Sequence, residues 1–373
     1  MKFNVSSTKL FAQLQAVSRV VAPKNSLPVL DCVLFDLHGQ TLTLSASDSE
    51  TTIRTSLEVE NAEGEGKVAF GAKLLIGTLK EFAEQPLTFT IDDQNFGLNI
   101  TSSNGTYSFI GSNGNDFPEM PKMEGEVHSF VIPDNTLLNA INKTIFCTAD
   151  DDLRPVMNGL YFDLTQEQFT LVATDAHRLV RYMNAAIRTE EPSSFILPKK
   201  PALLLKNVLG KGENVQVSFN AKNAQFEFGP MTIVCRRIDG IYPKYSGVIP
   251  KNNQNKVIVD RMALLNACKR VAVFANSSTS LLKLTLSENL LKISAQDISF
   301  YTSAEEVLAC NYDGAAMSIG FKAPFLIELL SNLASDEVML ELADPARAGL
   351  LLPMENEENE DLLMLLMPLL LND

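Results

Sequence analysis

Hydrophobic and polar positions along this chain fall into short blocks that switch from a period of two to a helical period. Phe3 and Val5 alternate with polar residues, whereas Leu10 and Leu14 follow at helical spacing. The hydroxyl residues Ser6-Ser7-Thr8 between the two blocks are typical helix caps. The start of the chain therefore predicts a strand followed by a helix.

The same block recurs twice, each time after a shift of 127 residues. Its second copy has Phe130, Ile132 and the expected cap Asp134, and its third has Val257, Val259 and the cap Asp260. A second strand-helix block lies inside each copy, and alternating runs that predict further strands follow it. Lysines mark the start of these inner helices: Lys73, Lys200 and Lys322.

A short motif, Ala-x-Asp, closes an alternating strand in each copy. It occurs as Ala46-Ser47-Asp48, Ala173-Thr174-Asp175 and Ala295-Gln296-Asp297, at spacings of 127 and 122 residues. The lysine markers keep the same two spacings, so a change in length falls between Cys268 and Asp297, where the polar loop 276–280 is the expected place. The middle motif alone continues into His177-Arg178, which suggests that the second copy carries an additional function.

The chain therefore predicts six strand-helix-strands units, two in each of three domains. Aromatic-proline segments followed by polar linkers, at 116–121 and 241–245, mark the boundaries. We expect an α+β fold of three repeated domains with antiparallel sheets outside and helices inside. The expected domains span residues 1–122, 128–252 and 256–373.

Composition indicates an ordinary globular protein, with 46% hydrophobic and 20% charged residues among 373. No apolar run reaches the roughly 18 residues that a membrane span needs, and we see no signal peptide. Five cysteines are scattered without a CxxC pair, so we expect buried thiols in a reducing cytoplasm, and neither a metal site nor a cofactor. They are Cys32, Cys147, Cys235, Cys268 and Cys310.

The net charge of −14 argues against nucleic acid until its distribution is considered. The six helical segments expected at 7–24, 72–83, 134–146, 199–210, 260–272 and 322–333 hold thirteen basic and four acidic residues. They sum to +9, and the remainder of the chain sums to −23. Helices tolerate Lys and Arg well, which is one explanation. The other is that these helices face a polyanion.

Several motifs in a fixed order then point to a family. They are Leu27-Pro28-Val29-Leu30, Arg154-Pro155-Val156-Met157-Asn158-Gly159, Ala173-Thr174-Asp175-Ala176-His177-Arg178-Leu179, Tyr242-Pro243-Lys244-Tyr245 through Val248-Ile249-Pro250, and Met367-Pro368. Over its whole length the chain resembles the bacterial DNA polymerase III beta subunit, the replicative sliding clamp. The resemblance implies three clamp domains, a head-to-tail homodimeric ring that encircles duplex DNA without sequence preference, and a processivity role without catalysis.

The resemblance also implies two sets of site residues. Near the DNA path we expect Lys24, Lys73, Arg154, Lys199, Lys200, Lys206 and Arg270. Polymerase subunits, the clamp loader and repair proteins would bind by short apolar motifs in a groove between the second and third domains. Its expected residues are Met157, Thr174, His177, Arg178, Leu179, Pro243, Val248, Lys322, Phe325, Leu365, Met367, Pro368 and Leu369.

The chain departs from the family pattern at its end. Clamps commonly finish with Arg-Leu soon after Met-Pro, whereas Leu369-Leu370-Leu371-Asn372-Asp373 follows here. Two rival functions remain at this point. Asp175, His177 and Arg178 could form an acid-base cluster of an enzyme, although no phosphate loop, metal spacing or nucleophile elbow accompanies them. The chain could also be a structural repeat protein without a role on nucleic acid.

Overall fold

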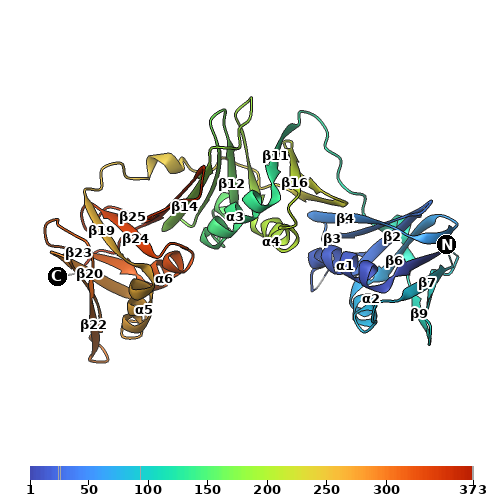
Figure 1. Ribbon diagram of the computed structural model, residues 1–373, viewed down its shortest axis with the longest axis horizontal. Helices are drawn as coiled ribbons and strands as arrows, with labels where there is room; N and C mark the ends of the chain where they lie inside the picture. Colours follow the sequence, from blue (N-terminus) through green and yellow to red (C-terminus); the bar gives the residue numbers. More distant parts are fainter. Residues whose placement is uncertain (24, 26, 93, 372–373) are drawn as a thin grey trace. The chain divides into compact units, whose positions relative to one another are not determined.

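The computed structural model describes residues 1–23, 25, 27–92 and 94–371 (Figure 1). The chain divides into two compact units. Unit 1 consists of Met1–Leu138 and Lys200–Arg237, and unit 2 of Asn139–Lys199 and Ile238–Asp373. Two helices, α3 (Asp134–Thr144) and α4 (Lys199–Val208), cross from one unit to the other.

Unit 1 contains two antiparallel sheets in its described part. The smaller one has the order β5 (Glu60–Glu63), β1 (Lys2–Ser6), β7 (Pro86–Ile91), β8 (Gly97–Thr101), β9 (Thr106–Ile110). The larger one has the order β10 (Ser112–Asn113), β6 (Gly66–Gly71), β2 (Cys32–His38), β3 (Thr41–Ser47), β4 (Thr51–Glu58), β18 (Met231–Arg236), β17 (Asn223–Phe228), β16 (Asn214–Phe219), β11 (His128–Pro133). Helices α1 (Ser7–Val17) and α2 (Ala72–Leu79) pack side by side (Figure 1).

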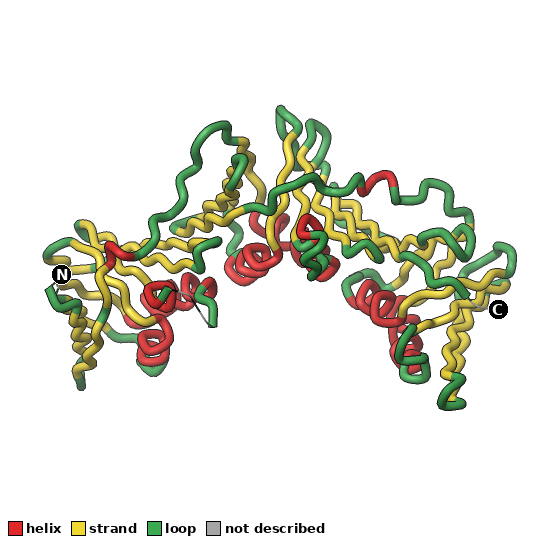
Figure 2. Tube along the Cα trace, turned by 180° about the vertical axis from the view of Figure 1, so that it is seen from behind, coloured by secondary structure: helices red, strands yellow, loops and turns green. Residues whose placement is uncertain are grey.

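Unit 2 repeats this plan with two sheets in its described part, which we name sheet C and sheet D. Sheet C has the order β15 (Ser193–Pro198), β12 (Gly159–Leu164), β13 (Phe169–Thr174), β14 (Arg178–Asn184), β26 (Glu360–Leu366), β25 (Gly349–Pro353), β24 (Glu337–Leu342), β19 (Asn255–Asp260). Sheet D has the order β22 (Thr302–Ala309), β21 (Leu290–Asp297), β20 (Leu281–Ser287), β23 (Met317–Lys322). Helices α5 (Arg261–Ala272) and α6 (Ala323–Ser331) lie together against the strands (Figure 2).

The two large sheets explain why the compact units do not coincide with the three expected domains. In unit 1, β4 pairs with β18, which comes from the second expected domain. In unit 2, β14 of the second domain pairs with β26 of the third along seven residue pairs. Each sheet is therefore continuous across a domain junction. The boundaries at 1–122, 128–252 and 256–373 remain a prediction.

The helices follow the predicted hydrophobic spacing but are shorter than the predicted segments. Leu10, Leu14 and Val17 form the buried face of α1. That helix ends at Val17 and continues as a single 3₁₀ turn, Ser18–Val20, so the expected segment 7–24 was too long. Helix ends commonly tighten into such turns because their last carbonyls have no partner along the helix.

Two helix caps were predicted correctly and a third residue does something else. The Ser6 hydroxyl accepts a hydrogen bond from the Lys9 N–H at 3.1 Å, and the Asp260 carboxylate accepts one from the Ala263 N–H at 2.6 Å. Asp134 Oδ2 instead accepts the backbone N–H groups of residues 210, 211 and 212 at 3.1, 2.7 and 2.9 Å. Burial opposes the charge of Asp134, but these donors outweigh it and lower its pKa.

All five cysteines are free, and four are buried, as expected, whereas Cys310 is only partly buried. Burial raises the pKa of the Cys268 thiol to about 12, which leaves it protonated and unreactive at neutral pH. Among the described residues, no helix is long and apolar enough to cross a membrane.

Candidate functional site

The turn after β13 holds His177 and Arg178 in fixed positions. Asp175 Oδ1 accepts the backbone N–H groups of His177 at 2.9 Å and Arg178 at 2.7 Å. The Thr174 hydroxyl donates to the Arg178 carbonyl at 2.6 Å, which closes the turn from the other side. Ala176 at the tip has a φ of 73°, in the left-handed region. The turn therefore presents the His177 side chain to solvent while the backbone beneath it is tied down.

The same turn explains the repeated Ala-x-Asp motif. Asp48 Oδ1 accepts the N–H groups of Glu50 and Thr51, and Asp297 Oδ1 accepts the N–H of Ser299 at 2.9 Å. The aspartate is thus a structural residue, since it caps the turn that ends each strand. In the middle copy its second oxygen accepts a hydrogen bond from the Arg178 side chain, so both carboxylate oxygens of Asp175 have partners within the turn.

The buried side chain of Arg178 forms the centre of a small network that reaches the surface at Glu328. This side chain is 7% exposed and pairs with Asp175 at 3.0 Å and with Glu328 of α6 at 2.5 Å. Its guanidinium also lies 4.4 Å from the centroid of the Phe325 ring. Burial opposes the positive charge, but the two carboxylates outweigh that effect and raise the pKa of Arg178. The network fixes α6, and with it Phe325, against the turn.

A cavity of about 1100 Å³ opens beside this network, entirely within unit 2. The rings of His177 and Phe325 stack on one wall with their centroids 5.8 Å apart. Six of the predicted groove residues line it: His177, Lys322, Phe325, Met367, Pro368 and Leu369. We name this space the groove cavity. Met367 is 43% exposed, so its thioether is available to a ligand.

The C-terminal segment forms part of the cavity wall because its backbone is held at two points. The Met367 N–H donates to the His177 carbonyl at 2.9 Å, and the Leu369 N–H donates to the Gly320 carbonyl of β23 at 2.8 Å. A Cβ atom on Gly320 would lie 2.8 Å from the Leu369 carbonyl oxygen, so glycine permits this approach. The altered tail through Leu371 thus lines the cavity; Asn372 and Asp373 lie outside the described residues.

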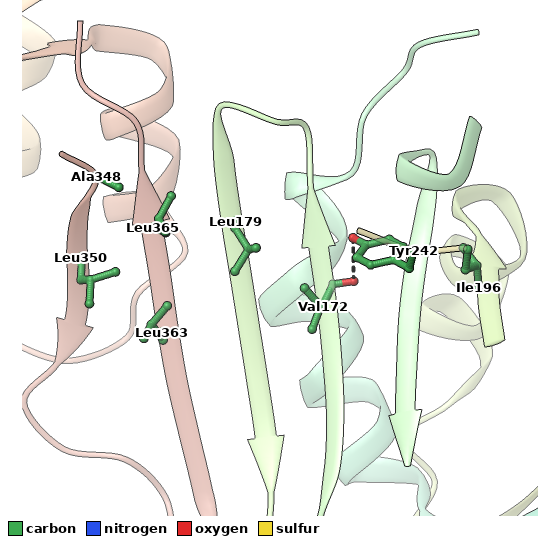
Figure 3. Packing of buried hydrophobic residues seen from close by; sticks show 8 residues of the cluster. All are labelled: Val172, Leu179, Ile196, Tyr242, Ala348, Leu350, Leu363 and Leu365. Atoms are coloured by element: carbon green, nitrogen blue, oxygen red, sulfur yellow. Dashed lines mark hydrogen bonds between the residues drawn. The ribbon is translucent and has the colours of Figure 1, made fainter. Parts of the chain in front are cut away.

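Four further predicted groove residues lie in the structure that supports the cavity. Leu179 and Leu365 face each other across the β14–β26 pair and belong to a buried apolar cluster (Figure 3). In the same cluster Tyr242 donates its hydroxyl to the Val172 carbonyl at 3.5 Å (Figure 3). Thr174 and Arg178 are buried in the turn. These residues determine the position of the wall rather than contacting the space itself.

Three predicted residues are not brought to this cavity. Met157 ends the short 3₁₀ helix Pro155–Met157 and is half-buried. Pro243 is half-buried, and Val248 is 58% exposed after the 3₁₀ helix Tyr245–Gly247. Val156, Tyr245 and Ile249, their neighbours in sequence, pack against the apolar cluster. Met157, Pro243 and Val248 are therefore neighbours in sequence of residues that pack against the cluster, and their role in a groove stays a prediction.

Sheet D contributes a wall of the cavity that was not predicted from the sequence. Leu282, Leu284 and Leu286 are buried, and the residues that alternate with them point outward. The outward residues of β20, β21 and β22 line the cavity together with the preceding loop. They include Asn276, Thr279, Leu281, Lys283, Ser294, Gln296, Ile298, Ser303 and Glu305. The period of two could have identified them as outward, although not as cavity residues.

The residues expected near DNA are mostly exposed, and several have carboxylate partners. Arg154 pairs with Asp151 at 2.9 Å, Lys200 pairs with Asp48, and Arg270 forms two hydrogen bonds of 2.7 Å with Glu306. Lys73 and Lys206 are exposed and Lys199 is half-buried. Lys24 lies outside the described residues. The exposed pair of Arg154 with Asp151 is worth little, whereas the Asp48 partner of Lys200 is only 9% exposed.

The charge of the helices is smaller than the expected segments gave. Helices α1 to α6 contain nine basic and two acidic residues, a net charge of +7 instead of +9. One of the nine, Arg261, donates to the carbonyls of Ser335 and Leu330, so it closes the end of α6. The helices remain basic in a chain whose total charge is −14.

Comparison with known families gives three matches in sequence order. Residues 1–121 match the DNA polymerase III beta subunit N-terminal domain, residues 131–244 its central domain, and residues 246–369 its C-terminal domain. Among curated proteins, the beta sliding clamp of Pseudomonas putida is 29% identical over 98% of this chain and 99% of its own length. That of Escherichia coli is 29% identical over 92% of this chain and 93% of its own.

Solved structures give the same result. The crystal structure of the DNA polymerase III subunit beta from Pseudomonas aeruginosa superposes with a TM-score of 0.94 at 28% identity, covering 100% of both chains. A DnaN sliding clamp from the same species bound to griselimycin also has a TM-score of 0.94, at 28% identity and 100% coverage of both chains. The clamp from Bartonella birtlesii, also bound to griselimycin, has a TM-score of 0.89 at 27% identity, again over 100% of both chains.

Proposed function

Because this chain belongs to the DNA polymerase III beta subunit family and is a sliding clamp, a non-catalytic processivity factor of DNA replication, we propose that it recruits its partners through the groove cavity of unit 2. The cavity carries the proposal, since it gathers His177, Phe325 and Met367 around one space. An adaptable thioether and stacked rings suit short peptides with leucine or phenylalanine anchors.

The first domain junction supports this assignment by contrast. A shift of 127 residues relates Val172 and Leu179 of the second junction to Ser45 and Thr52 of the first. The former two belong to the buried apolar cluster, whereas the latter two line a smaller cavity of about 560 Å³ together with Asp36, Arg54 and Lys67. At these two positions the second junction is therefore the more apolar one and suits apolar anchors better.

We further propose that two copies close head to tail into a ring around duplex DNA. Sheet D ends at β22, and the small sheet of unit 1 ends at β9. Each edge carries an exposed apolar side chain, Val307 at 56% and Ile110 at 87%. Open apolar edges favour pairing with another strand, and β9 of one copy with β22 of the next would cover both.

The DNA contact proposed for this ring is weak and independent of sequence. Basic helices at a net +7 attract phosphates, and topological linkage removes the need for tight binding. The residues that we assign to it are those predicted from the sequence, Lys24, Lys73, Arg154, Lys199, Lys200, Lys206 and Arg270. The partners that we assign to the groove are polymerase subunits, the clamp loader and repair proteins, and the compartment is the cytoplasm.

Two measurements test these proposals. A labelled peptide with a leucine and a phenylalanine anchor should bind with a dissociation constant in the micromolar range, which corresponds to a binding free energy of about −8 kcal/mol. The same peptide with both anchors changed to alanine should not bind in this range. Light scattering in moderate salt should give a mass of about twice 41.0 kDa. Equal binding of the two peptides would contradict the groove, and a monomer at micromolar concentration would contradict the ring.

A further inference from the structure

The groove cavity continues beyond its apolar wall onto the outward face of sheet D. One row of residues crosses this face in register, from Gly320 of β23 to Lys283 of β20, Ser294 of β21 and Glu305 of β22. Lys283, Ser294 and Glu305 line the cavity. We name this row and its neighbours Leu281, Gln296 and Ser303 the polar extension. Most of its side chains carry a hydroxyl, an amide or a charge, in contrast to the wall formed by His177, Phe325 and Met367, which we name the anchor wall.

The two charged residues of this row differ in whether they have an ion-pair partner within the chain. Glu305 has a lysine partner, since its carboxylate lies 3.5 Å from the Lys292 ammonium group. Among the described residues, neither Lys283 nor Lys322 lies within ion-pair distance of a carboxylate. The Lys322 ammonium instead lies 4.8 Å from the centroid of the Phe325 ring. Two lysines therefore stand where the anchor wall meets the polar extension.

The nearby ion pairs of Arg178 leave the positive charges of Lys283 and Lys322 without a carboxylate partner in the described part of the chain. Arg178 lies over the same Phe325 ring at 4.4 Å, but Asp175 and Glu328 already hold its guanidinium. An acidic ligand near Lys283 and Lys322 would therefore meet positive charge without having to displace an internal partner. In a chain of net charge −14, such a local site favours acidic segments over neutral ones at short range.

We propose that the polar extension binds an acidic segment flanking the apolar anchors of a partner peptide, and that Lys283 selects for it. The occupant is one extended peptide, whose anchors fill the space between His177, Phe325 and Met367 and whose acidic residues lie beside Lys283 on β20. Ser294 and Gln296 offer hydrogen-bonding groups to its backbone. This inference rests on the proposed groove and adds the chemistry of the flanking residues.

The test compares three labelled peptides that share a leucine and a phenylalanine anchor. Each carries one flanking pair of identical residues, which is two glutamates, two glutamines or two lysines. The pair is placed before the anchors in one set and after them in another, and fluorescence anisotropy is measured at low and moderate salt. The glutamate peptide should bind roughly three- to ten-fold tighter than the glutamine peptide in one of the two sets, and salt should reduce the difference.

Two variants of the full chain locate the effect. Lys283→Gln should remove the preference for glutamate, so that the glutamate and glutamine peptides bind this variant with equal affinity. Lys269→Gln makes the same change of charge at an exposed position of α5 that does not line the cavity, and it should leave the preference for glutamate intact.

Each contrary result has a separate meaning. Equal affinities of the glutamate and glutamine peptides for the wild-type protein would overturn the acidic preference but leave the groove standing. A preference that survives in Lys283→Gln would overturn the role of Lys283. If none of the peptides binds, the groove itself fails and the polar extension fails with it.

Discussion

Truncation of Met367 to alanine measures what the groove contributes to partner binding. The side chain is 43% exposed, and a bound peptide would cover that fraction. Burying a whole methionine side chain is worth about 1.5–3 kcal/mol, so covering less than half of it is worth about 1 kcal/mol. The expected loss is about five-fold in peptide affinity. The fold should be unaffected, because the Met367 N–H bond to the His177 carbonyl is made by the backbone and remains in the variant.

Fluorescence anisotropy with an anchor-bearing peptide gives the affinity, and light scattering checks the assembly. Met354→Ala is a matched control, since Met354 is the same residue type at 40% exposure in unit 2 but does not line the cavity. It should change neither measurement. Equal losses in the two variants, or dissociation of the dimer in Met367→Ala, would refute the reasoning that places the groove here.

Three other changes probe parts of the account. Asp134→Asn should lower the free energy of unfolding by about 2 kcal/mol at pH 7, because a buried carboxylate loses its charge towards three N–H donors. Folding lowers the pKa of Asp134, so the stability that its carboxylate contributes is lost as acid protonates it. Chemical denaturation should therefore show that the difference in unfolding free energy between the wild type and Asp134→Asn becomes smaller below about pH 4. Gly320→Ala should displace the tail at Leu369 and weaken peptide binding in the anisotropy assay at least two-fold, with little change in dimer mass. Lys199→Glu with Lys200→Glu should reduce the amount loaded on DNA in a salt-dependent manner while light scattering still reports a dimer.

The sequence predicted the features that depend on local periodicity. The buried face of α1 and the caps at Ser6 and Asp260 follow from spacing within a few residues. The threefold strand-helix repeat follows from the recurrence of such blocks along the chain. The repeated aspartate was also recognised in the sequence. Only the structure shows why it recurs: its carboxylate accepts backbone N–H groups of the turn that follows each strand.

The sequence could not predict features that join distant segments. Lys200 pairs with Asp48 across 152 positions, and Asp134 binds the turn at residues 210–212, and neither contact leaves a trace in local spacing. The polar extension was missed for a related reason. Alternation in β20 indicates which side chains point outward, but only the fold determines that a C-terminal segment passes beside β23 and encloses them.

We propose that two copies of this chain form a closed ring linked topologically to DNA. The most direct measurement is retention of the labelled protein on nicked circular DNA after loading by the clamp loader, followed by a wash in high salt and cleavage of the circle at one site. The account predicts that the protein stays on the circle through the wash and leaves after cleavage, because phosphate contacts are weak and screened while the linkage is not. Release in the wash, or retention after cleavage of DNA with free ends, would contradict it.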